Sequence, residues 1–300
     1  MTALLTEPDA GAEPTGDAAP SLRAARRHQP AWAALPAVVL FVVGFVGPLV
    51  MLLLTSLGYS ADNHTLSFDA YRHVFDDPAQ FRVIGNTITT SLLVVALSVV
   101  IGYPVALCFM SISGWRRTAL AIIIVGSLLV NSVIRVFGWL VLFVPNGFVS
   151  DQFSVDLLYT HTATVIGLLH LFMPFMILSL ITSLSSIDPV LIRAATSLGA
   201  GMGRIMARVV LPLSLPGLVS GSIIVFGATT GSVVTPLLLG GADEQLVTVE
   251  VYRRTFVSFD PTGAASLAAC LLILNIVLVT LVQLGNRRLE RRLHLATERG

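Results

Sequence analysis

DPVLIRAATSLGAGMGRIMARVVLPLSLPGLVSG, residues 188–221, lies between two long apolar runs and predicts two short helices separated by glycines. Asp188 can cap the first helix, and Pro189 suits its first turn, where a backbone N–H lacks a helical partner. Gly199 stands where a left-handed residue would end that helix. We expect the two prolines of LPLSLPG to stop the second helix before a new apolar run begins.

The first of these two helices has an apolar face. The residues that share this face, at three- and four-residue spacing, are Leu191, Ala194, Ala195 and Leu198. The stretch is neither a membrane span nor a linker, although it lies between two candidate spans. We therefore expect the face to be held by another protein.

The composition is that of a polytopic membrane protein. Of 300 residues, 55% are hydrophobic and 12% are charged, and the mean hydropathy is +0.85. A net charge of +1 gives no indication of nucleic-acid binding. All 18 basic residues are arginines, so the chain has no lysine for a phosphate-binding P-loop. Cys108 and Cys270 both fall in apolar runs, and we expect neither a disulfide nor a metal site.

Six apolar runs are each long enough to cross a membrane as a helix, which takes about 20 residues. They lie at about 34–57, 84–110, 118–143, 163–184, 216–239 and 265–284. The first run is too long for the apolar part of a signal peptide, so we interpret it as an uncleaved span. Residues 1–33 are rich in Ala, Pro and acidic residues and predict a disordered tail, and residues 287–300 form a basic tail.

The arginines indicate the orientation of the spans. With both termini inside the cell, most arginines fall on the cytoplasmic side, in agreement with the positive-inside rule. Both tails and residues 188–212 are then cytoplasmic. The expected location is a prokaryotic inner membrane, which the chain crosses several times.

The AATSLGA sequence at 194–200, followed by LP and then PG at 216–217, resembles the EAA loop of ABC-importer permeases. In that family the loop is a coupling helix that seats in a groove of a separate ATP-binding subunit. Arg193 stands where the family usually has glutamate, and we expect the ATP-binding partner to carry a compensating acid. The resemblance implies that the ATPase docks at Arg193, Ala194, Ala195, Leu198, Gly199, Ala200 and Arg204.

The resemblance extends over most of the chain. Asn86-Thr87 with GYPVA at 102–106, and SVIRVFGW at 132–139, are similar to the second and third spans of these permeases. LHLFMPFMIL at 169–178 and TPLLLGG at 235–241 resemble spermidine/putrescine-type importers in particular, and the latter favours the PotB-like permease of such a pair.

The resemblance implies an all-α membrane protein with six transmembrane helices and type I ABC importer permease (MetI-like) architecture. Residues 34–286 would form the permease domain, with the coupling loop at 188–217. The implied partners are an ATP-binding subunit dimer, a second six-helix permease, an extracytoplasmic solute-binding protein and membrane lipid. The chain would be no enzyme and would hold no cofactor, because the partner subunit binds ATP.

Polar residues within the spans are candidates for the solute path. Arg135 lies about 25 Å along a straight helix from Thr118, where it either anchors the helix at the outer interface or lines a cavity. Gly231 and Pro236 predict either a break in the fifth span, a feature typical of a translocation path, or close helix packing through small residues. The candidate path residues are Asn131, Arg135, Trp139, Thr229, Thr230, Ser232 and Thr235.

The expected solute is a polyamine such as spermidine or putrescine. No Asp or Glu lies within the six runs, however, so carboxylates for a polycation would have to come from a partner. An amino-acid-like or opine-like solute is the alternative. An ion-coupled secondary carrier is a further alternative, but it would need ionisable residues at mid-membrane and no docking loop.

Overall fold

The computed structural model describes residues 35–59, 66–145, 147–242 and 245–297, and over these residues it contains helices and no strand. Six of the described helical segments are long and apolar enough to cross a membrane, which confirms the predicted number of spans. They are Val38–Ser56, Pro78–Ser111, Ser132–Gln152, His161–Ser185, Met202–Thr230 and Pro261–Asn286. The predicted tail at 1–33 lies outside the described residues.

The chain divides into two units, residues 1–49 and 50–300. In the first unit, α1 (Leu35–Phe41) continues through a π-helical turn, Val42–Val46, into α2 (Gly47–Ser56), which runs on into the second unit. Phe41 and Phe45 stack within this segment, with ring centroids 5.3 Å apart.

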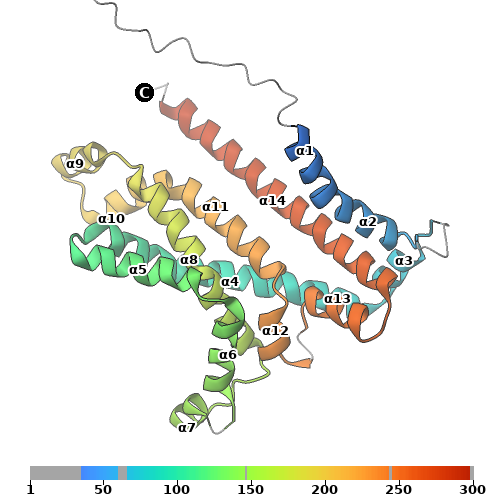
Figure 1. Ribbon diagram of the computed structural model, residues 1–300. Helices are drawn as coiled ribbons and strands as arrows, with labels where there is room; N and C mark the ends of the chain where they lie inside the picture. Colours follow the sequence, from blue (N-terminus) through green and yellow to red (C-terminus); the bar gives the residue numbers. More distant parts are fainter. Residues whose placement is uncertain (1–34, 60–65, 146, 243–244, 298–300) are drawn as a thin grey trace, which may run out of the picture. The chain divides into compact units, whose positions relative to one another are not determined.

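Three long helices form the centre of the second unit and lie side by side in Figure 1. They are α4 (Pro78–Ser111), α8 (His161–Ser185) and α11 (Leu211–Thr230). A Cβ on Gly217 would lie 2.3 Å from the Cβ of Ser183, so only glycine allows α11 to approach α8 this closely. Ser179 Oγ donates a hydrogen bond to the Gly217 carbonyl at 2.8 Å across the same contact. Such packing through small residues and hydroxyls is typical of membrane helices.

The third predicted span, 118–143, is wrong as a single helix. The structure divides it into α5 (Trp115–Leu129) and α6 (Ser132–Phe143). Val130 is extended, and the Asn131 side chain accepts the Val133 N–H at 2.8 Å as the N-cap of α6. Asparagine offers the backbone this alternative to a continuing helix. The position of Arg135 calculated along a straight helix is therefore also wrong.

The fifth span is longer than predicted because its prolines do not stop it. A continuous helix runs over Met202–Thr230 through α10 (Met202–Ile205), a π-helical turn (Met206–Val210) and α11. Pro212 is the second residue of α11, directly after the π-helical turn where the hydrogen-bond register changes. Its missing N–H therefore removes little of the helix's backbone hydrogen bonding. The predicted break near Gly231 is confirmed, and the chain resumes as α12 (Val234–Leu239).

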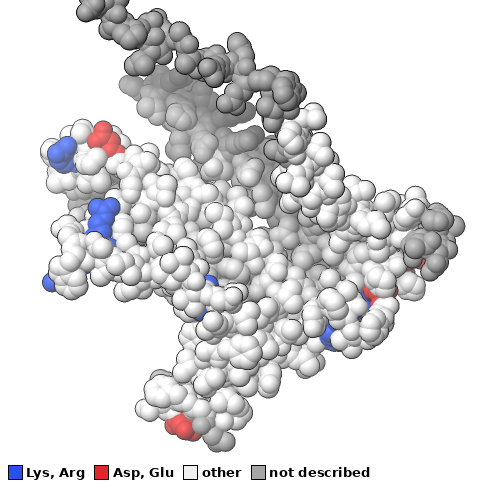
Figure 2. Space-filling view, in the orientation of Figure 1, with Lys and Arg blue, Asp and Glu red and all other residues white. Residues whose placement is uncertain are grey.

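The remaining helices lie around this centre. α3 (Asp69–Asp76) and α13 (Val247–Phe256) both pack against α14 (Pro261–Thr297), which continues as a helix through most of the expected basic tail. Two short helices, α7 (Phe148–Phe153) and α9 (Pro189–Ser197), lie in connections between longer ones. Figure 2 shows charged side chains over α9 and α10 and over α13, and the surface between them is largely uncharged except for a small blue patch near its centre.

Candidate functional site

The beginning of α9 follows the sequence prediction. Asp188 Oδ1 accepts the Val190 N–H at 2.8 Å, and Pro189 is the first residue of the helix. A cap of this kind satisfies one of the otherwise unpaired N–H groups of the first turn. The start of the helix is therefore fixed by local chemistry.

The end of α9 is fixed as well. Gly199 has φ +75°, a left-handed conformation that a side chain would strain. The Gly199 N–H donates to the Thr196 carbonyl at 2.9 Å, and the Ala200 N–H donates to the Ala195 carbonyl at 3.1 Å. These two bonds make a Schellman motif, which confirms the predicted glycine termination.

The apolar face predicted for α9 divides into an outward and an inward part. Ala195 and Ala200 are partly buried and pack against the core of the central helices, and the docking role predicted for both stays a prediction. Leu198 is 88% exposed and Met202 is 75% exposed. The outward apolar residues, which we call the docking face, are Val190, Leu191, Ala194, Leu198 and Met202. Arg193 and Arg204 are also exposed.

A cavity of about 510 Å³ lies between α6, α8 and the break that follows α11. Arg135, Ser232 and Thr235 line it, so the structure brings together three of the predicted path residues. Within the described chain, Arg135 Nε and Nη1 are buried and have no hydrogen-bond partner, and neither has Thr235 Oγ1. We call this space the arginine cavity. Of the two alternatives for Arg135, cavity lining therefore agrees with the structure.

Three of the other four predicted path residues make hydrogen bonds within the protein. Asn131 caps α6, as described above. Trp139 Nε1 donates to His170 Nδ1 at 3.1 Å, and Thr230 Oγ1 donates to Asn275 Oδ1 at 2.9 Å. Thr229 is fully buried, and its hydroxyl has no partner among the described residues. None of these four is among the described residues that line the arginine cavity.

A second cavity, of about 530 Å³, lies between α8 and α11 toward the end of α8 that leads into α9. We call it the hydroxyl cavity, after the residues that give it its polar wall: Ser179, Thr182, Ser183, Ser186 and Ser220. Sequence reasoning missed it, although the three α8 hydroxyls and that of Ser186, the C-cap of α8, recur at helical spacing. Phe175 lines both this cavity and the arginine cavity.

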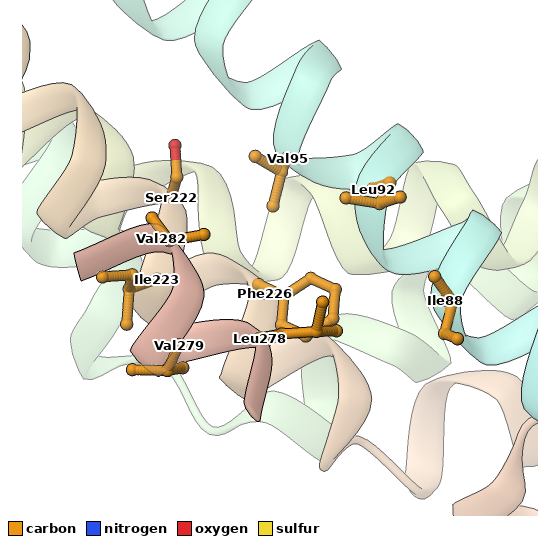
Figure 3. A pocket seen from close by; sticks show the side chains of 9 residues that line it. All are labelled: Ile88, Leu92, Val95, Ser222, Ile223, Phe226, Leu278, Val279 and Val282. Atoms are coloured by element: carbon orange, nitrogen blue, oxygen red, sulfur yellow. The ribbon is translucent and has the colours of Figure 1, made fainter. Parts of the chain in front are cut away.

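A third space, of about 130 Å³, is an apolar groove between α4, α11 and α14. In Figure 3 the side chains of Leu92, Phe226 and Val279 are among those that line it, and they carry no polar atoms. Ser222 supplies the one hydroxyl that the figure shows, and it donates to the Leu218 carbonyl of its own helix at 2.7 Å. The groove offers nothing to orient a polar solute. The described residues contain no group of three His, Cys, Asp or Glu side chains that could hold a metal ion.

Six membrane-length helices, polar cavities among them and a capped, exposed helix beyond them are typical of a transport permease. The chain belongs to the family described as "Binding-protein-dependent transport system inner membrane component", which matches residues 98–293. The predicted family is confirmed, and the chain is a permease subunit of an ABC importer in a bacterial inner membrane.

Individual relatives agree with this assignment. The chain is 28% identical over 238 residues to the spermidine/putrescine transport system permease protein PotB of Haemophilus influenzae, covering 77% of this chain and 83% of that protein. The fold is similar to that of a bacterial alginate ABC transporter in complex with a periplasmic protein that carries an alginate pentasaccharide (TM-score 0.73, 19% identity, 85% and 93% coverage). It is also similar to the MetNI methionine ABC transporter (TM-score 0.53, 21% identity, 71% and 94% coverage), which confirms the MetI-like architecture.

Proposed function

We propose that this permease forms half of the translocation path for a polyamine such as spermidine or putrescine and couples it to a separate ATPase. The name of the PotB relative supports the polyamine, since that protein is described as a spermidine/putrescine permease. The single observation that carries the coupling role is the exposed docking face of α9, whose two ends are both fixed by local hydrogen bonds.

The docking face is suited to a protein partner. Exposed apolar side chains gain about 25 cal/mol for each Å² that a partner covers. Because both ends of α9 are fixed, a movement of the bound partner can be transmitted through this helix to the spans without unwinding it. The ATP-binding subunit is the partner that the EAA-like sequence implies. Arg193, in place of the usual glutamate, would meet an acidic side chain in its groove.

The proposed path follows the face that α8 and α11 present to the two polar cavities. The arginine cavity lies near the break after α11, and the hydroxyl cavity lies nearer α9. A second six-helix permease would supply the other wall, and a solute-binding protein would deliver solute at the end away from α9. In this arrangement both termini and α9 are cytoplasmic.

One observation favours a second candidate solute. Arg135 places a positive charge at a cavity whose described lining includes no carboxylate, and it repels a polycation there. An amino-acid-like or opine-like solute carries an acid that Arg135 could bind through charge-assisted hydrogen bonds.

Reconstitution tests the proposal. The complete complex in proteoliposomes, with its binding protein and ATP, should take up radiolabelled spermidine, and the permease alone should not. ATP-dependent uptake of an amino-acid-like solute, without spermidine uptake, would favour the second candidate. Uptake by the permease alone in the absence of ATP would contradict the coupling role and favour an ion-coupled carrier.

A further inference from the structure

We propose that the hydroxyl cavity is the site at which this permease holds the protonated amino groups of its solute. The proposal rests on the function proposed above, namely that the solute is a polyamine. It assigns binding to α8 and α11 residues that the sequence did not single out: Ser179, Thr182, Ser186 and Ser220.

Two hydroxyls of this cavity, those of Thr182 and Ser186, have their protons engaged. Thr182 Oγ1 donates to the Leu178 carbonyl at 2.9 Å, and Ser186 Oγ donates to the Ser183 carbonyl at 2.7 Å. A hydroxyl has one proton and two lone pairs. Once the proton is given to a backbone carbonyl, the oxygen can act toward the cavity only as an acceptor.

Ser179 and Ser220, on the facing helices, behave in the same way. Both are within donating distance of the Gly217 carbonyl, at 2.8 and 3.2 Å. Their oxygens also lie 2.7 Å from each other, and either can be the donor. Whether Ser179 or Ser220 is the donor between them, both hydroxyl protons are donated to groups of the cavity wall. The lone pairs of the two oxygens then remain available to a ligand.

An ammonium group is the complement of such a wall, because it has three donors and no acceptor. No charged side chain is among the described residues that line the hydroxyl cavity, so nothing there repels a cation. The arginine cavity has the opposite character, because its guanidinium can only donate and is positively charged. A polyamine on this path should therefore rest in the hydroxyl cavity rather than in the arginine cavity.

Two further features suit an amine of some length. Ser179 and Ser186 are two helical turns apart, about 10 Å along the axis, so amino groups at both ends of a diamine can meet hydroxyls. Phe175 is 38% exposed and borders both cavities. An aromatic ring at this position attracts a cation that comes within about 6 Å of its face.

A labelling experiment tests the site without depending on transport. Thr182→Cys is introduced into a full-length chain that carries Cys108→Ala and Cys270→Ala, and the complex is assembled without its binding protein. We expect putrescine and spermidine to slow the reaction of the new thiol with a methanethiosulfonate reagent. 1,4-Butanediol has the length of putrescine without its charge and should give no protection.

Second substitutions identify the hydroxyls that bind. Ser186→Ala or Ser220→Ala should raise the putrescine concentration for half-protection about tenfold, the loss expected for one hydrogen bond to a charged group. Thr89→Val is the matched control, since Thr89 Oγ1 donates to the Gly85 carbonyl of its own helix at 2.9 Å and lines neither cavity. This control should leave the half-protection concentration unchanged.

The outcomes separate this site from the proposed function. If the wild-type complex imports spermidine but neither amine protects the thiol, the assignment is overturned and the polyamine function stands. Equal protection by 1,4-butanediol would also overturn it, because charge would then not matter. If the wild-type complex imports no polyamine, both the proposed solute and this site fail.

Discussion

The Ala200 N–H donates to the Ala195 carbonyl at 3.1 Å across Gly199, which has φ +75°. This bond joins the two ends of the turn after α9 and leaves Leu198 projecting, with 88% of its surface exposed. The turn thus holds one apolar side chain in the position where a partner can cover it.

Gly199→Val should abolish ATP-dependent uptake and leave membrane insertion intact. A β-branched residue at positive φ costs about 1–2 kcal/mol or more, so the turn would open and α9 would lose its orientation. Proteoliposome uptake and membrane fractionation measure the two effects. Gly203→Val is the control, because Gly203 has no left-handed conformation and nothing lies within 4 Å of a Cβ there. Normal uptake by Gly199→Val would count against the coupling role.

Leu198→Ser should weaken association with the ATP-binding subunit by about tenfold, the loss typical of an important apolar contact. Phe259→Ser provides the comparison, since Phe259 is 81% exposed and lies in the connection between α13 and α14. Pull-down of the ATP-binding subunit by each variant measures the difference. Equal retention by both variants would argue that α9 is not the docking element.

Arg193→Glu should lower ATP-dependent uptake if the partner has an acid opposite this exposed guanidinium. Reversal of that acid to arginine in the partner should restore uptake in the Arg193→Glu permease. Such a rescue identifies the pair directly. Wild-type uptake by the single variant would remove the proposed compensating acid.

Arg135→Gln distinguishes the two candidate solutes. If the solute is a polyamine, removing this charge from the arginine cavity should leave spermidine uptake unchanged or increase it, because repulsion is lost. If the solute carries an acid, uptake should fall at least about tenfold, because a charge-assisted bond is lost. The measurement is the initial rate of uptake with each labelled solute.

Gly217→Ala should destabilise the α8–α11 contact by about 1–3 kcal/mol, as overpacking of a tight contact does. The added Cβ would lie 2.3 Å from the Ser183 Cβ and 2.7 Å from the Ser179 carbonyl oxygen. Gly126→Ala in α5 meets nothing within 4 Å and should be neutral or slightly stabilising. Thermal unfolding in detergent compares the two variants, and an unchanged midpoint for Gly217→Ala would contradict the close packing.

Local chemistry explains which features the sequence could predict. Asp188 and Gly199 act on the backbone within two or three residues, so their roles follow from the order of residues alone. The number of spans follows from the length and polarity of the apolar runs. The family follows from short motifs that need no knowledge of packing.

Other features depend on contacts that no local pattern contains. Asn131 interrupts an apolar run by capping a new helix, and the continuation of the helix through Pro212 depends on the π-helical turn before it. Residue spacing alone cannot separate the side of α9 that packs against the core, where Ala195 and Ala200 lie, from the side that is exposed. The hydroxyl cavity needs α11 beside α8, and the spacing of α8 hydroxyls was its only sequence signal.

The most direct test of the coupling role is cross-linking at Leu198. Leu198→Cys, in a chain with Cys108→Ala and Cys270→Ala, is assembled with its partners in native membranes and treated with a short bifunctional thiol reagent. We predict a cross-link to a cysteine introduced in the groove of the ATP-binding subunit, and no labelling by an impermeant reagent added outside the cell. Labelling from outside, with no cross-link to that subunit, would contradict the account.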